Sequence, residues 1–176
     1  MKFKEVRNLI VTGLHEYMGL SVVLSNQLNP EMALPFIIYS VTAPYIPEGG
    51  TGNMQPMTNE DGTVKVTRYE QPTCTFSFTI CSADRQTKDG FVLGEDEALD
   101  LAEKAQGWFL HTGYEYISGK GLTVVDVANV QERSFLQVDE EARRYGFDVV
   151  LRYVRTDEMT VAGVKAATTK KGDDNE

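Results

Sequence analysis

Residues 122–155 constrain the fold most, because they hold two segments rich in Val, Leu, Tyr and Phe. Such side chains suit a pleated, half-buried backbone, so the segments predict two strands joined by a charged, solvated turn. One face of the second strand is entirely apolar, and we expect it to be buried. Its members are Phe147, Val149, Leu151 and Tyr153.

Residues 73–82 alternate more regularly than any other segment, with apolar side chains on one face and hydroxyls on the other. The predicted buried face holds Cys74, Phe76, Phe78 and Ile80. Cys81, the second cysteine, lies about 23 Å further along this strand at ~3.3 Å per residue, and on the other face. The two thiols cannot bridge each other, and we expect them to be reduced, as in an intracellular protein.

The remaining pattern predicts two amphipathic helices, over residues 3–18 and 95–110, and further strands at residues 22–24, 36–42 and 63–69. Residues 43–62 read as a long loop or an extended hairpin, and residues 84–94 and 114–121 as loops. The order of elements predicts an α+β fold, with two helices packed on one face of a mainly antiparallel sheet. We expect a single domain over residues 1–158 and a flexible tail over residues 159–176.

The charge balance argues against tight nucleic-acid binding. The chain carries 26 acidic and 17 basic residues, a formal net charge of −9. A protein that holds DNA tightly neutralises phosphates with the opposite sign. No window approaches the ~18 apolar residues of a membrane span, and no signal peptide is evident, so we expect a protein made in a cytoplasm that does not contact a membrane.

Candidate catalytic and metal-binding groups are sparse. His15 and His111 have no partner at metal-ligand spacing, and the acidic start of the second helix suits the helix dipole. A small metal-dependent hydrolase using that acidic group and a histidine is the alternative enzymatic hypothesis. We expect a protein that is not an enzyme and has no catalytic residues, cofactor or metal.

Arginines and tyrosines are the side chains that point to contacts with other proteins. The arginines near the final turn have two interpretations of equal weight: ion pairs on a solvated hairpin, or a rim that docks a neighbouring subunit. Tyrosines beside loops favour the second interpretation. The predicted subunit interface comprises Tyr45, Arg68, Tyr69, Arg133, Asp139, Glu140, Arg143 and Arg144.

Several segments together resemble the neck or tail terminator (tail completion, head-tail joining) proteins of long-tailed bacteriophages. The resemblance covers most of residues 5–155, and its motifs are structural rather than catalytic. The segments that carry it are residues 13–20, 22–26, 35–40, 71–78, 124–133 and 144–149.

The resemblance implies a structural virion protein that forms a ring, hexameric in this family, on the end of the tail tube. The ring would bind the tail tube protein and a head-side connector or stopper protein, in the virion neck after assembly in the bacterial host cytoplasm. DNA would pass through the lumen without specific binding, because an acidic wall repels it. Residues 43–68 and 132–144 are the candidate contact segments, and another head-tail connector or tail assembly subunit is the alternative within this class.

Overall fold

A six-stranded sheet forms the centre of the molecule, which is described by a computed structural model over residues 1–26, 32–134 and 142–163. The strands run in the order β1-β2-β5-β10-β8, with the short β9 also paired to β10. All pairs are antiparallel except β1 with β2. The bounds are β1 (Val22–Leu24), β2 (Phe36–Ile46), β5 (Thr73–Ser82), β8 (Leu122–Val127), β9 (Gln131–Glu132) and β10 (Arg143–Tyr153).

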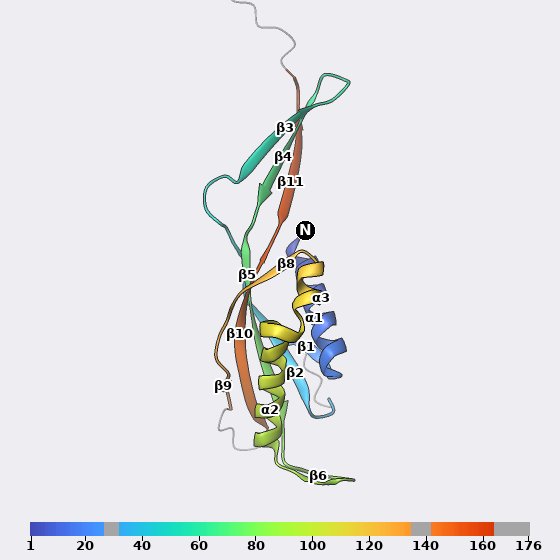
Figure 1. Cartoon of the computed structure of the whole chain (residues 1–176), viewed down its shortest axis with the longest axis vertical. Helices are drawn as coiled ribbons and strands as arrows, with labels where there is room; N and C mark the ends of the chain where they lie inside the picture. The colour runs from blue at the N-terminus through green and yellow to red at the C-terminus, as the bar shows by residue number, and fades with distance from the viewer. Residues whose placement is uncertain (27–31, 135–141, 164–176) are drawn as a thin grey trace, which may run out of the picture.

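The helices lie together on one face of this sheet (Figure 1). The predicted α+β class is therefore confirmed, although the helical layer has more pieces than the two expected. Residues 114–121, predicted as a loop, contain a short third helix, and a π-helical turn extends the second. The bounds are α1 (Phe3–Met18), α2 (Gly94–Gly107), the π-helix η1 (Trp108–Thr112) and α3 (Tyr114–Gly119).

The core lies between the helices and the predicted apolar faces of β5 and β10. Phe78 on β5 packs against Phe147 of β10 at 6.0 Å between ring centroids and against Phe109 of η1 at 5.2 Å. The members of both predicted faces are buried, which confirms the alternation. Both cysteines are buried, and burial raises the pKa of the Cys74 thiol to about 12.

A second sheet projects from this body as an arm (Figure 1). It consists of three antiparallel strands in the order β11-β4-β3. The segment predicted as a long loop or hairpin therefore contains a hairpin strand. Residues 159–161, which were predicted to belong to the tail, are instead part of β11, which pairs with β4 as far as Val161. The bounds are β3 (Asn53–Thr58), β4 (Val64–Glu70) and β11 (Arg155–Val161). Residues 164–176 lie outside the described residues, and the division into one domain and a tail stays a prediction.

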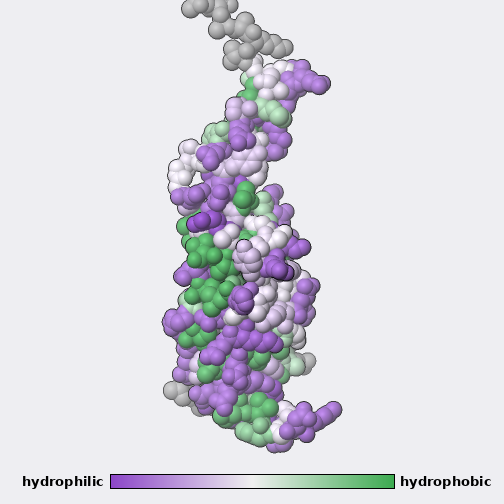
Figure 2. All heavy atoms as spheres, in the orientation of Figure 1, coloured by the Kyte–Doolittle hydropathy of each residue, from purple (hydrophilic) through white to green (hydrophobic). Residues whose placement is uncertain are grey.

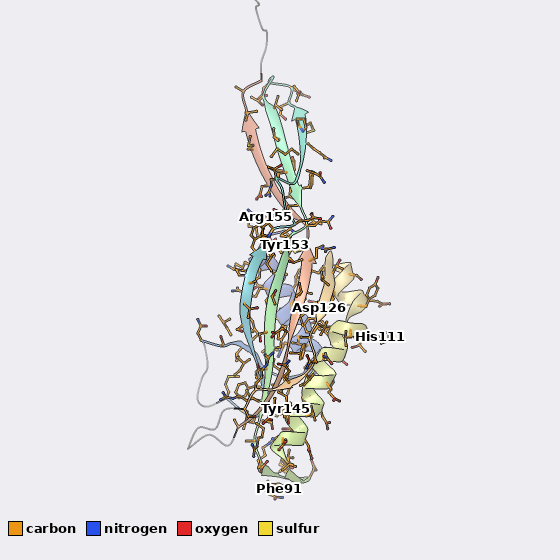
Figure 3. The ribbon with its side chains drawn as sticks, turned by 90° about the vertical axis from the view of Figure 1, so that its left-hand side faces the viewer. Phe91, His111, Asp126, Tyr145, Tyr153 and Arg155 are labelled. Atoms are coloured by element: carbon orange, nitrogen blue, oxygen red, sulfur yellow. The ribbon has the colours of Figure 1, made fainter. Side chains whose placement is uncertain are left out.

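A small hairpin forms the end of the body opposite the arm, where a loop was expected. Its strands are β6 (Arg85–Thr87) and β7 (Gly90–Val92). Phe91 on β7 is 64% exposed, and Figure 3 shows it at this far end. The arm, the body and this hairpin give the molecule its elongated shape (Figure 1).

Candidate assembly interface

A polar cluster holds the junction of arm and body, and we call it the waist cluster. The Glu70 carboxylate, 3% exposed, accepts the hydrogen bond of the Tyr45 hydroxyl, whose oxygen lies 2.7 and 2.8 Å from the two carboxylate oxygens. The same carboxylate pairs with Nη2 of Arg68 at 2.7 Å. A buried carboxylate is stable only when such partners replace its water, so the cluster fixes β2 of the body to β4 of the arm.

Arg68 extends the waist cluster to the third strand of the arm. Its Nη1 donates to Asp157 of β11 at 3.1 Å, and its Nε donates to the Thr51 carbonyl at 2.6 Å. The hydrogen bond with Tyr45 raises the pKa of Arg68. Burial raises the pKa of Asp157, but its bonds with Arg155 and Arg68 outweigh that effect and lower it. Arg155 also lies over the Tyr45 ring, 5.1 Å from the centroid.

Arg133 spans the face of the sheet opposite the helices. Its Nη1 donates to the hydroxyls of Ser77 and Thr79 on β5, at 2.6 and 3.2 Å, and its Nη2 pairs with Asp148 of β10 at 2.9 Å. Burial raises the pKa of Asp148, but hydrogen bonds from Ser77 and Arg133 lower it below its usual range. Gly146 makes room for this arrangement, because a Cβ there would lie 3.0 Å from Cδ of Arg133 and 2.3 Å from the Phe78 carbonyl oxygen. The charge of Arg133 is therefore engaged within its own chain.

The predicted interface residues fall in two separate places. Tyr45 and Arg68 meet in the waist cluster, whereas Tyr69 lies on the opposite face of β4 and is 37% exposed. Arg143 and Arg144 begin β10, where the Arg144 carbonyl accepts a hydrogen bond from the Arg133 backbone at 2.7 Å. Tyr145 is the next residue of β10, and Figure 3 shows it well below Tyr153 and Arg155 at the junction with the arm. Asp139 and Glu140 lie outside the described residues.

A groove beside β8 is a surface that the sequence did not reveal. It has a volume of about 450 Å³ and lies between β8, η1 and α3. Three apolar side chains on its rim are largely exposed: Leu110 (62%), Tyr114 (71%) and Val125 (45%). Figure 2 shows hydrophobic residues gathered over this part of the body. The remaining lining residues are Phe109, Ile117, Ser118, Leu122, Thr123, Val124, Asp126 and Val127, and we call the whole the β8 groove.

The arm carries a second exposed apolar surface, which follows from its strand register. Residues directly opposite each other across strands share a face. Val66 lies opposite both Pro56 and Met159, and Val64 lies opposite Val161. This surface, the arm face, comprises Met54, Pro56, Thr58, Val64, Val66, Met159 and Val161. Met54 and Met159 are 57% and 58% exposed.

The residues considered for catalysis lie apart. His15 on α1 contacts the Leu20 carbonyl through Nδ1 at 2.6 Å, and His111 on η1 points away from the sheet (Figure 3). Glu97 of the acidic helix start pairs with Arg85 at 2.7 Å. Within residues 1–26, 32–134 and 142–163, no three His, Cys, Asp or Glu side chains converge as a metal site. In the same ranges, no helix combines the length and apolarity that crossing a bilayer requires.

These features define a class of protein. It is an elongated α+β protein whose arginines in the waist cluster and at Arg133 pair with carboxylates of the same chain, and whose exposed apolar surfaces suit contacts with other proteins. The family model of the phage neck terminator protein matches residues 4–174, which is nearly the whole chain. The chain therefore belongs to the phage neck terminator family, a family of phage structural proteins rather than enzymes. As a neck protein, it is a component of the virion that assembles with other head and tail proteins. No curated protein matches the chain.

Proposed function

We propose that this protein forms a ring, of six copies, that ends the phage tail tube and joins it to the head-side connector. The observation that carries the proposal is the family match over residues 4–174, which includes the arm as well as the body. The two exposed apolar surfaces support it, since a ring subunit needs contact surfaces for its neighbours and for the proteins above and below.

The proposed path of the genome is the lumen of this ring. With a net charge of −9 per copy, six copies carry a strong negative field. Such a field repels the phosphate backbone and lets DNA slide instead of binding it. The tail tube protein and a head-side connector or stopper are the proposed partners on the two sides of the ring.

The test combines mass measurement with microscopy. Light scattering of the purified protein, alone and mixed with tail tubes, should give a six-copy assembly in solution or on the tube end. Electron microscopy should then show a six-fold ring capping the tube. A protein that stays monomeric and ignores tail tubes would overturn the proposal, whereas a ring on the connector side alone would assign it to another step of head-tail joining.

A further inference from the structure

The arm face is apolar and largely exposed to solvent. No arm residue belongs to the cluster of buried apolar side chains in the described part of the chain; that cluster lies in the body. A three-stranded sheet gains stability by covering its apolar face. Val66 and Val64 on the central strand are half-buried by their own neighbours, while Met54, Met159 and Val161 remain 57%, 58% and 39% exposed.

The β8 groove has the complementary form, a hollow with an apolar floor and rim. Phe109, Ile117 and Leu122 are almost fully buried at its base, and the exposed rim side chains stand around them. Methionine is long and unbranched, so it fills irregular apolar hollows well. The exposed methionines of the arm face match the groove in size and chemistry.

The distribution of charge favours a second copy of this chain as the partner that fills the β8 groove. Two copies that each carry −9 repel each other wherever their acidic residues meet. On the face of the arm that carries these apolar side chains, Arg68 lies opposite Met54, but its charge is paired with Glu70 and Asp157. Asp126 is the single charged side chain among those that line the groove. At the base of the arm, the waist cluster adds two arginines and two acidic residues, which cancel. These two surfaces are therefore places where like-charged copies can meet.

Area favours the same occupant. Seven-residue strands about 23 Å long, three across at ~4.8 Å spacing, give the arm face roughly 300 Å². A standard interface covers about 800 Å² on each partner, so a single contact through the arm face is small. In a closed ring every subunit makes two such contacts, its arm with one neighbour and its groove with the other, and ring closure adds their strengths together.

The edge strand β3 of the arm and the free edge of β8 are both poorly suited to pairing, so we place the contact between faces rather than between these two edges. Pro56 lacks a backbone donor within the edge strand β3. A register shift in the pairing of β8 with β10 places a bulge at Val125 on the other edge. Both features are known protections against strand addition.

We propose that the arm face of one copy packs into the β8 groove of the next copy. The contact is head-to-tail: each subunit uses two different surfaces, which a ring requires. This inference rests on the proposed ring and specifies the contact that builds it. It assigns the contact to Met54 and Met159 on one side and to Leu110 and Val125 on the other.

The first test uses two complementary variants. Met54→Glu with Met159→Glu disables the arm face, and Leu110→Glu with Val125→Glu disables the groove. Each variant alone should be monomeric by light scattering. A mixture should give a 1:1 dimer and nothing larger, because only one intact arm and one intact groove remain. Since the partner rescues it, dimer formation also shows that both variants are folded.

Matched controls use residues of similar exposure outside both surfaces. Met57 lies on β3 on the opposite face and is 61% exposed, and Leu93 lies before α2 and is 46% exposed. Met57→Glu and Leu93→Glu should assemble like the wild-type protein. The proposed contact would be overturned if the arm variant and the groove variant assembled like the wild-type protein, as the two controls should. It would also be overturned if the arm and groove variants were folded monomers that formed no dimer when mixed.

A second test places the contact in the phage particle. The double variant Met159→Cys and Val125→Cys should form disulfide-linked ladders of up to six copies in oxidised particles, whereas each single variant should form none. Particles that contain the double variant but give no ladder would overturn the arm-to-groove contact and leave the ring proposal intact. Absence of the wild-type protein from the neck of particles would overturn the proposed function itself.

Discussion

The ring of Tyr116 occupies the space that a side chain on Gly13 would need. A Cβ built on Gly13 would lie 2.4 Å from Cε1 of that ring. The Tyr116 hydroxyl donates a hydrogen bond at 3.0 Å to the carbonyl of Leu9, which lies on α1 with Gly13, and the Tyr116 ring packs beside Trp108. Gly13 costs α1 about 1 kcal/mol of helix stability relative to alanine. It is also the position at which α3 packs against α1.

We therefore predict that Gly13→Ala destabilises the protein, although alanine favours helix. Overpacking against a held ring costs roughly 1–3 kcal/mol, which exceeds the ~1 kcal/mol gained in propensity. Urea unfolding measures the change in free energy. Gly107→Ala is the matched control, because Gly107 ends α2 with nothing within 4 Å of a new Cβ, and we expect it to stabilise. Equal effects of the two substitutions would contradict this account.

Loss of the Tyr45 hydroxyl should loosen the arm. Tyr45→Phe removes the hydrogen bond that the hydroxyl donates to the buried Glu70 carboxylate, and a hydrogen bond to a charged group contributes about 1.5–3 kcal/mol. Amide hydrogen exchange should speed up in β4 and β11 more than in β5. Tyr69→Phe, on the other face of β4, serves as the control and should leave exchange unchanged; faster exchange in both variants would place the effect elsewhere.

The Glu97 carboxylate should make stability depend on pH. The hydrogen bond from Arg85 holds the pKa of Glu97 below its usual 4.5, against the opposing effect of burial. A lowered folded pKa contributes stability that is present above pH 4.5 and lost as pH falls through the folded value. Glu97→Gln should flatten the unfolding free energy between about pH 5 and 3 relative to wild type. An unchanged slope in this variant would contradict the role of Glu97.

Both thiols should be unreactive in the folded protein. Cys74 is fully buried with a pKa of about 12, and Cys81 is 1% exposed. Because the thiolate is the reactive form, a thiol reagent at pH 8 should label neither cysteine in native buffer and both in concentrated urea. Rapid labelling of either cysteine in the native state would show that the sheet opens more readily than its packing indicates.

The sequence by itself determined the layers of the body. Strict alternation over residues 73–82 and 147–153 assigned the buried faces correctly, and three- and four-residue spacing placed α1 and most of α2. These signals are local, because an amphipathic element displays its buried face within a few residues of chain. The resemblance to phage neck or tail terminator proteins was likewise confirmed by the family match.

The tertiary structure decided the arm, α3 and both apolar surfaces. β11 has the polar composition of a tail and becomes a strand through pairing with β4, which lies some 90 residues earlier, as in the pair of Arg68 and Asp157. Tyr45 and Arg68 were predicted as contact residues, but the fold joins them through Glu70, which lies on the same strand as Arg68 and 25 residues from Tyr45 in the sequence. Contacts between remote segments leave no periodic signal in the chain, since their energy appears only once the fold brings the partners together.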